Sequence, residues 1–291
     1  MVKIKNLFRL NLVYGLFCTI RYYKNWFSIL FGYLLHISPR HYIIRFGKVE
    51  IPPIGHFYGA FEHLALLLNN DWEVKLNSDG ILLSNKDHRF ICRNDIGSDI
   101  TELKEIFIDK IYENKALSGI VIDIGMSSSN SSIFFAKNGA NFVIGVEPSN
   151  SSYELAKKNI KLNGLTNIKT YNAFLCSEDS KRKTFINSKS GYITNSIETK
   201  NEIIVEGITL ERIVEENNID TINTLKMDCE GCEYEFFESV SSSLLEKINF
   251  IYLEYHSGYS RILINKIMNI FDIIVHKKID KENGFIVFRK R

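Results

Sequence analysis

The chain has 291 residues, which is enough for one large domain or for a domain with an extension. Its formal net charge is only +2, and we expect no nucleic-acid partner. The near balance hides an asymmetry, because residues 1–49 contain eight Lys and Arg but no Asp or Glu. A basic end of this kind is typical of a segment that meets an anionic surface.

Two apolar runs, 10–20 and 26–37, lie in this basic segment and are separated by the stretch RYYK at 21–24. A membrane-spanning helix needs about 20 unbroken apolar residues, and neither run is that long. No small-residue cleavage site follows the first run, so a signal peptide is not predicted. Aromatic residues mixed with Arg and Lys favour helices that lie in a membrane interface. The alternative is an amphipathic helix pair that packs on the main domain, so residues 1–48 leave peripheral membrane association open.

The chain contains five cysteines, Cys18, Cys92, Cys176, Cys229 and Cys232. Their number is odd, and a chain of this length does not need disulfide bonds to fold, so we expect the cysteines to be reduced, in a cytoplasmic protein. The last two form a C-x-x-C. Because a second such pair and histidines at zinc spacing are missing, we interpret them as two small residues in a turn rather than a metal or redox site.

Residues 1–112 predict a helical and small α+β extension. Helices are expected up to residue 37 and over 60–68 and 99–112. Short strands are expected over 41–46, 48–52, 72–76, 80–84 and 89–92. The Asn-Ser-Asp-Gly stretch at 77–80 supplies a hairpin turn.

Residues 113–291 change to an alternation of strands and helices. Apolar strands are predicted over 120–124, 142–146, 168–171, 222–227 and 248–254. Helices are predicted over 131–137, 151–162, 209–217, 233–240 and 261–269, with a β-rich excursion over 174–205. A final hairpin pairs 271–276 with 285–288 around Asn283-Gly284. The pattern predicts an α/β fold with a doubly wound, mostly parallel seven-stranded sheet.

The first two strands end in residues suited to a nucleoside-containing ligand, because ligands of open α/β sheets bind at the carboxyl ends of the strands. Asp123 and Gly125 close the first strand, and Ser127 to Ser132 supply hydroxyls and amides at a helix start. Gly125 permits a sharp turn and a close approach to a ligand. Glu147 ends the second strand at the interval expected for an acid that binds both ribose hydroxyls.

A dinucleotide such as NAD is the alternative ligand for these two strand ends. Its diphosphate requires G-x-G-x-x-G, so that backbone amides can close on two phosphates. Ser127 and Asn130 stand at the second and third glycine positions. This disfavours NAD, whereas a sulfonium ligand has no phosphate and does not require those glycines.

The fourth strand leads into an acid-rich turn with Asp228, Glu230 and Glu233. Like charges so close together are costly unless a cation or a shared proton relieves them. We expect Asp228 and Glu230 to face the cleft, while Glu233 suits the first turn of the next helix. His256 follows the fifth strand and is a candidate to take a proton from an acceptor hydroxyl at neutral pH.

Five pieces of the chain carry a resemblance to a known family. They are VIDIG at 121–125, GVEP at 145–148, ITL at 208–210, LKMDCEGCE at 225–233 and LEYH at 253–256. With them, residues 121–256 resemble the FkbM family of S-adenosylmethionine-dependent methyltransferases. The most specific piece is the K-x-D-x-E-G-x-E run within 225–233.

This resemblance implies the Rossmann-like fold of class I methyltransferases and O-methylation, often of sugars. Matching positions imply cofactor contacts near Gly125 and Glu147, and place Asn172 and Ala173 near the adenine. The family usually has Asn at the Ser127 position and a second Gly at the Ser129 position. Ser129 adds a side chain where the backbone should pass close to the cofactor, which predicts weakened binding or a degenerate site.

We therefore predict an O-methyltransferase that uses S-adenosylmethionine and acts on a hydroxyl of a glycan or lipid-linked saccharide. Asp123, Gly125, Ser127, Ser129, Glu147, Asn172 and Ala173 are the predicted cofactor residues. Asp228, Glu230 and His256 are the predicted catalytic residues, with His256 or Asp228 accepting the proton and a divalent cation on Asp228 and Glu230 left open. The alternative is a non-catalytic, membrane-attached glycan-assembly protein that keeps a degenerate methyltransferase fold. The oligomeric state is not predicted.

Overall fold

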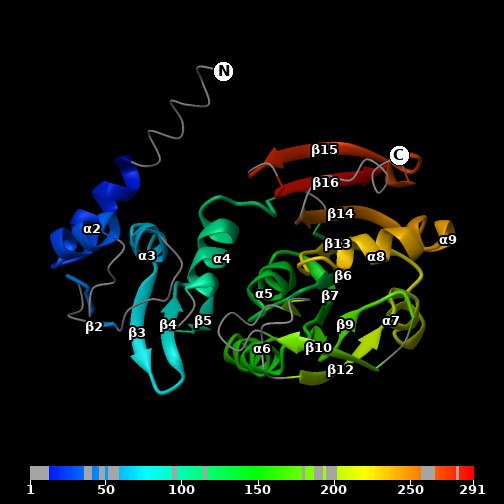
Figure 1. The fold of residues 1–291 in the computed structure, drawn as a ribbon, viewed down its shortest axis with the longest axis horizontal. Helices are drawn as coiled ribbons and strands as arrows, with labels where there is room; N and C mark the ends of the chain where they lie inside the picture. Colours follow the sequence, from blue (N-terminus) through cyan, green and yellow to red (C-terminus); the bar gives the residue numbers. More distant parts are fainter. Residues whose placement is uncertain are drawn as a thin grey trace. The chain divides into compact units, whose positions relative to one another are not determined.

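We describe the protein from a computed structural model. It describes residues 13–35, 41–45, 50–51, 59–93, 97–113, 117–178, 181–186, 193–194, 202–256, 266–279 and 282–291. The chain divides into two compact units, Met1–Glu113 and Asn114–Arg291 (Figure 1). Each unit is described by itself.

The first unit combines helices with small antiparallel sheets. Its helices cover residues 13–22, α2 (Trp26–Leu34), α3 (Ala60–Leu68) and α4 (Ser98–Phe107). Its strands are β1 (Tyr42–Ile43), β2 (Glu50–Ile51), β3 (Glu73–Asn77), β4 (Gly80–Ser84) and β5 (Arg89–Cys92). β1 pairs with β2, and β3, β4 and β5 form a three-stranded meander. The predicted helical and α+β character of this region is confirmed.

Aromatic rings and one buried ion pair hold the first unit together. Trp72 packs against the rings of Phe90 and Phe107, with centroids 6.1 and 5.1 Å away. The buried carboxylate of Asp99 accepts hydrogen bonds from the Arg93 guanidinium, the shortest at 2.6 Å. Helix α4 ends at Phe107, earlier than the predicted residue 112.

The early end of α4 has a local cause. Ile108 and Asp109 both donate their backbone N–H to the carbonyl of Lys104. Lys110 then adopts a left-handed conformation with φ 58°, which a continuing right-handed helix cannot include. The predicted helix therefore stops about one turn short.

The second unit is built on a seven-stranded sheet with the order β15-β16-β14-β13-β6-β7-β8. These strands are β6 (Gly119–Ile124), β7 (Ala140–Val146), β8 (Ile168–Tyr171), β13 (Ile222–Met227), β14 (Ile248–Tyr255), β15 (Phe271–Lys278) and β16 (Gly284–Lys290). The first five pair in parallel, and β16 lies antiparallel between β14 and β15. The predicted mostly parallel sheet with a terminal hairpin is confirmed.

The chain starts at the central strand β6, runs outward through β7 and β8, and later returns to β13 on the other side of β6. β6 and β13 are parallel neighbours, with Ile124 opposite Met227. Their carboxyl ends therefore meet at one edge, where the direction of winding reverses. This switch point is the ligand position of open α/β sheets.

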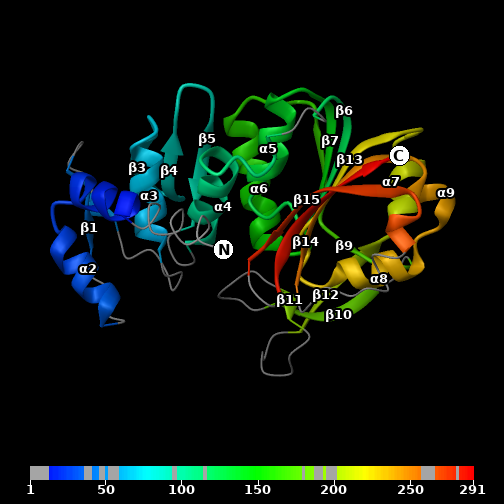
Figure 2. The same ribbon diagram turned by 90° about the horizontal axis from the view of Figure 1, so that it is seen from above.

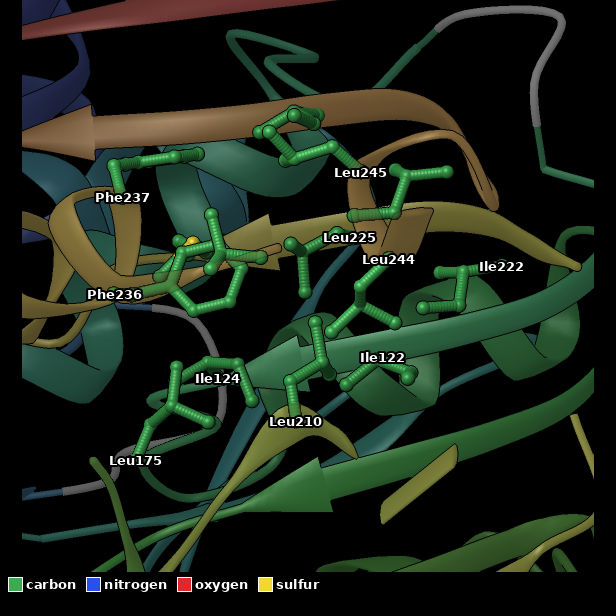
Figure 3. Close-up of a cluster of buried hydrophobic side chains, with 14 of the residues drawn as sticks. Ile122, Ile124, Leu175, Leu210, Ile222, Leu225, Phe236, Phe237, Leu244 and Leu245 are labelled. Atoms are coloured by element: carbon green, nitrogen blue, oxygen red, sulfur yellow. The ribbon is translucent and has the colours of Figure 1, made fainter. Parts of the chain in front are cut away.

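Helices cover both faces of the sheet. α5 (Asn130–Lys137) and α6 (Asn150–Leu162) lie on one face, while α7 (Leu210–Glu216), α8 (Cys232–Ser239) and α9 (Ser242–Leu245) lie on the other (Figure 2). Apolar side chains of the strands and of the second helical layer, among them Ile122, Leu225 and Phe236, form one buried cluster (Figure 3). Burial on both faces explains why most residues of the central strands are apolar.

A second, four-stranded sheet confirms the predicted β-rich excursion. It contains β9 (Phe174–Leu175), β10 (Lys181–Ile186), β11 (Ile193–Thr194) and β12 (Glu202–Ile208), in the order β11-β10-β12-β9. Of the helix predicted over 261–269, residues 266–268 are helical and 261–265 lie outside the described residues.

The prediction that all cysteines are reduced is wrong for the C-x-x-C pair. Cys229 and Cys232 form a disulfide with their Cα atoms 5.5 Å apart. The chain turns through Gly231 at φ 118°, which brings the two Cα atoms within bridging distance. Cys18, Cys92 and Cys176 are free and buried.

Within the part of the chain that the structure describes, none of the helices combines the length and the apolarity needed to cross a membrane.

Candidate functional site

The turn after β6 touches the turn after β13 at Gly125. Gly125 has φ 77°, and a Cβ atom built on it would lie 1.8 Å from the carbonyl oxygen of Asp228. Both the backbone conformation and the lack of space require glycine here. The two turns that carry the predicted cofactor and catalytic residues are therefore in direct backbone contact.

Asp123 lies beneath this turn, fully buried. Its Oδ2 accepts hydrogen bonds from the hydroxyls of Ser131 and Ser132 at 2.7 and 2.6 Å. Its Oδ1 lies 3.1 Å from the ammonium of Lys226. The carboxylate thus fixes the start of α5 to the sheet, and a direct contact between Asp123 and a cofactor stays a prediction.

Lys226 is a site residue that the sequence reasoning did not single out. Its side chain is almost fully buried, and its ammonium donates a hydrogen bond to the carbonyl of Gly125 at 2.7 Å. The same nitrogen lies 3.1 Å from Asp123 and 3.9 Å from Asp228. Lys226 therefore ties the two turns together. The signal was available, because a lysine inside an otherwise apolar buried strand needs charged or polar partners.

Ser127 and Ser129 both adopt left-handed backbone conformations, with φ 47° and 71°. Ser129 is the N-cap residue of α5, and its side chain makes no capping hydrogen bond. Its hydroxyl is fully buried and has no hydrogen-bond partner among the described residues. Serine thus occupies a position whose conformation favours glycine.

Glu147 links the ends of the first two strands. Its Oε2 accepts a hydrogen bond from the backbone N–H of Ser127 at 3.0 Å, and its Oε1 accepts one from Ser149 at 2.8 Å. Only 6% of the residue is exposed. The carboxylate therefore points toward the β6 turn, where it can accept hydrogen bonds but not donate them when ionised.

Asn172 and Ala173 follow β8 at the same edge. The Asn172 amide donates hydrogen bonds to the carbonyls of Glu147 and Pro148 at 2.9 and 3.2 Å. Ala173 is buried. The ends of the first three strands are thus joined by direct hydrogen bonds.

The acid-rich turn after β13 surrounds one imidazole. His256 Nε2 lies 3.9 Å from Asp228, 3.7 Å from Glu230 and 3.8 Å from Glu254. Its Nδ1 lies 3.4 Å from Oε1 of the buried Glu233. Glu233 also accepts a hydrogen bond from the backbone of Gly231 at 2.9 Å, so it does more than interact with the dipole of α8.

This environment changes the protonation of the site. Burial lowers the pKa of His256, but the hydrogen bond with Glu233 and the charges of Glu230, Asp228 and Glu254 outweigh it and raise the pKa to about 9. Burial raises the pKa of Glu230, and the attraction of His256 opposes this rise. The negative charges of Asp228 and Glu233 add to it. His256 is therefore an imidazolium at neutral pH. It supplies the positive charge that the acid cluster requires.

The described residues contain two groups at this edge with the spacing for a metal ion. In the first, with Glu233, the sulfurs of Cys229 and Cys232 are joined in a disulfide. In the second, Asp228, Glu254 and His256 each place one ligand atom within 4.8 Å of the others. This group differs from the predicted pair of Asp228 and Glu230. A histidine binds a metal only in its neutral form, so a cation would have to displace the imidazolium proton.

The profile described as "Methyltransferase FkbM domain" matches residues 120–287, more than half of the chain. The chain belongs to the FkbM methyltransferase family. No curated protein sequence matches it. The family match covers the sheet from β6 into β16, and the predicted membership is confirmed.

Solved structures with a similar fold come from several bacteria. TrmK of M. capricolum, in complex with S-adenosyl-homocysteine, is 14% identical with a TM-score of 0.41, covering 63% of this chain and 67% of TrmK. FkbM from Methylobacillus flagellatus KT is 16% identical with a TM-score of 0.44, covering 64% of this chain and 47% of its own. The ribosomal protein L11 methylase from Lactobacillus delbrueckii subsp. bulgaricus is 18% identical with a TM-score of 0.38. The match covers 69% of this chain and 85% of the methylase. This chain thus spans about half the length of the M. flagellatus protein. Because every one of these TM-scores is below 0.5, we draw no functional conclusion from them.

The FkbM-family chain is an S-adenosylmethionine-dependent methyltransferase. The switch point fits this cofactor in two respects. Gly125 lets the β6 turn lie directly against the backbone of Asp228 in the β13 turn, and Glu147 aims an acceptor-only carboxylate at the β6 turn. Ser129 departs from the family pattern, because its buried Cβ atom and hydroxyl lie where the family usually has glycine.

Proposed function

We propose that this FkbM-family protein methylates a hydroxyl group of a sugar, in a glycan or a lipid-linked saccharide. The observation that carries the proposal is the cluster of Asp228, Glu230 and His256 beside Gly125. Carboxylates accept hydrogen bonds from hydroxyls, which suits an acceptor with several of them. S-adenosylmethionine supplies the methyl group, on a sulfonium that leaves as a neutral thioether.

Within this proposal, Asp228 accepts the proton of the attacking hydroxyl. His256 is already protonated at neutral pH, so it cannot perform the role predicted for it in that state. The Asp228 carboxylate is one third exposed and lies 3.9 Å from both Lys226 and His256. The two cations orient it. His256 and Glu230 then position the acceptor by hydrogen bonding, and much of the rate comes from that positioning.

The cofactor roles are part of the same proposal. Glu147 holds the ribose hydroxyls, and the turn with Ser127 and Ser129 lies against the methionyl part. Asn172 and Ala173 lie beside the adenine. Asp123 acts from below by holding α5 and Lys226 in place.

Calorimetric titration with S-adenosylhomocysteine separates the cofactor roles from the acceptor roles. Glu147→Gln replaces one acceptor oxygen with a donor, so we expect at least tenfold weaker binding. Asp228→Asn should bind the same ligand within about twofold of the unchanged protein, yet lose methyl transfer. Thermal melting of both variants checks that they fold. Equal binding losses in the two variants would remove the division of roles.

The acceptor class needs a separate measurement. Radiolabelled methyl transfer is assayed with free saccharides, lipid-linked saccharides and RNA, and the products are treated with mild alkali. An alkali-stable label on a saccharide supports a methyl ether and hence O-methylation of a hydroxyl. A labile methyl ester, or label on RNA, would refute the proposed acceptor while leaving the family assignment intact.

A further inference from the structure

The helix of residues 13–22 turns an apolar face to the solvent. Val13, Leu16, Phe17 and Ile20 are 63, 43, 55 and 38% exposed. Their spacing of three, four and seven residues puts them on one side of the helix. The opposite side, with Cys18 and Thr19, is buried. A surface helix of a water-soluble protein normally carries polar residues on its outer face.

Helix α2 repeats this arrangement. Phe27, Phe31 and Leu34 are 67, 55 and 74% exposed and follow one another at helical spacing. The rings of Phe27 and Phe31 stack with centroids 6.1 Å apart. Ile29 is buried on the inner side. Exposed apolar patches of this kind mark sites of interaction with proteins or membranes.

The inner sides of both helices pack against the first unit and form hydrogen bonds with it. The exposure of the outer faces is therefore not a result of poor packing. Tyr23 between the helices is fully buried, and its hydroxyl donates to the carbonyl of Phe61 at 2.8 Å. Asn25 donates to the carbonyl of His41 at 2.7 Å and accepts from the backbone of Ile43 at 3.0 Å. Among the described residues, these contacts hold the inner sides of both helices and leave the apolar faces exposed.

The charged residues of the two helices and their connection are positive. Arg21, at the end of the first helix, and Lys24, between the helices, are exposed, and no acidic residue occurs before Glu50. Glu62 lies against Gly15 on the inner side, where burial raises its pKa. A second copy docked through the same faces would add its own Arg21 and Lys24 to the shared interface, which increases the positive charge there. An anionic lipid surface instead complements them.

We propose that the helix of residues 13–22 and helix α2 dock together on an anionic membrane surface and lie in its interface (Figure 1). The exposed aromatic and aliphatic side chains enter the boundary between headgroups and acyl chains. Arg21 and Lys24 remain at the lipid phosphates. This docking is independent of the acceptor proposed above, although it would bring the enzyme to a lipid-linked substrate.

Vesicle sedimentation of the full chain tests the proposal. Phosphatidylcholine vesicles with 30% phosphatidylglycerol are compared with pure phosphatidylcholine vesicles. We expect at least tenfold stronger partition to the anionic vesicles. The double variant Phe27→Asp, Phe31→Asp should lose at least tenfold in partition. The control Leu76→Asp changes an exposed apolar residue of the same unit, on strand β3, and should bind as the unchanged protein does.

The charge contribution is measured with Arg21→Gln, Lys24→Gln. Each cation near such a surface contributes about 1 kcal/mol, so we expect about thirtyfold weaker partition to anionic vesicles and no change with neutral ones. Circular dichroism and thermal melting of every variant show whether it is folded. The docking proposal is overturned by equal partition to both vesicle types, or by a lipid-free dimer that dissociates in the Phe27, Phe31 variant.

Trp26 allows a measurement on the unchanged protein, should a variant fail to fold. Only two tryptophans are present, and Trp72 is buried, so fluorescence changes on adding vesicles report Trp26. Docking predicts quenching of this fluorescence by brominated acyl chains in anionic vesicles. Fluorescence that anionic vesicles leave unchanged refutes the proposal without any variant.

Discussion

Ser129→Gly should make the protein more stable, although it removes a side chain from a fully buried position. Ser129 has φ 71° and a hydroxyl without a partner among the described residues. Relief of the left-handed conformation contributes about 1 kcal/mol, and loss of the unsatisfied hydroxyl contributes about 1–3 kcal/mol. The greater chain entropy of glycine in the unfolded state opposes this by about 0.5–1 kcal/mol.

The net expectation is a stabilisation of about 1–3.5 kcal/mol, which corresponds to an increase in Tm of roughly 3–10 °C for a unit of this size. Ser128→Gly is the matched control, because Ser128 is the equally buried neighbour without a positive φ. There the glycine relieves no strain, so Tm should fall. Circular dichroism melts of both variants measure the difference. A Ser129→Gly variant that melts at or below the Tm of the unchanged protein would refute the reasoning from strain.

The same variant reports on the cofactor pocket. The family usually has glycine here, and removal of the Cβ atom widens the turn that lies beside Glu147. We expect severalfold tighter binding of S-adenosylhomocysteine in calorimetry. Weaker binding by a stabilised Ser129→Gly would instead mean that the buried hydroxyl contacts the ligand.

Three further perturbations test the geometry around this turn. Gly125→Ala places a Cβ atom 1.8 Å from the Asp228 carbonyl at φ 77°. We therefore expect loss of folded protein or of cofactor binding. An alanine variant with unchanged melting and binding would contradict the close contact. Lys226→Met leaves the buried carboxylate of Asp123 without its cation and should cost about 3–5 kcal/mol in urea unfolding; a loss below about 1 kcal/mol contradicts the ion pair. The pKa of His256 is raised from 6.5 to about 9, so its stabilising effect is complete below pH 6.5 and is lost as the pH rises through 9. His256→Gln should therefore lose up to about 3 kcal/mol near pH 6 and approach the unchanged protein above about pH 10, and a difference independent of pH would exclude the imidazolium.

Much of the fold was predictable because local and periodic signals agree. The apolar strands, the glycine after Asp123 and the acid after the second strand together indicate an open α/β sheet with its ligand edge. β13 and β14 pair in parallel, as the alternation of strands and helices predicts. The terminal hairpin follows from Asn283-Gly284, although the loop is longer than a tight turn and the pairing contains a register shift near Ile273.

The protonation of the site could not be predicted, because it depends on contacts between distant parts of the chain. His256 carries a proton only since Glu233 and three other carboxylates converge on it from two strand ends. A single strand-end histidine gives no sign of this in the sequence. Lys226 carried a local signal, as a lysine in a buried strand, but its partners could not be predicted, because Asp123 and Gly125 are about one hundred residues away.

The disulfide between Cys229 and Cys232 closes a loop of only four residues, so chain entropy alone gives it about 2 kcal/mol. The bridge also restrains the segment that bears Asp228 and Glu230, so a thiol reagent should lower Tm by roughly 4–8 °C and should change turnover as well. We therefore expect dithiothreitol in a purification buffer to alter the measured rate of this enzyme. Preparations made with and without it should be assayed side by side before any rate is assigned to the protein.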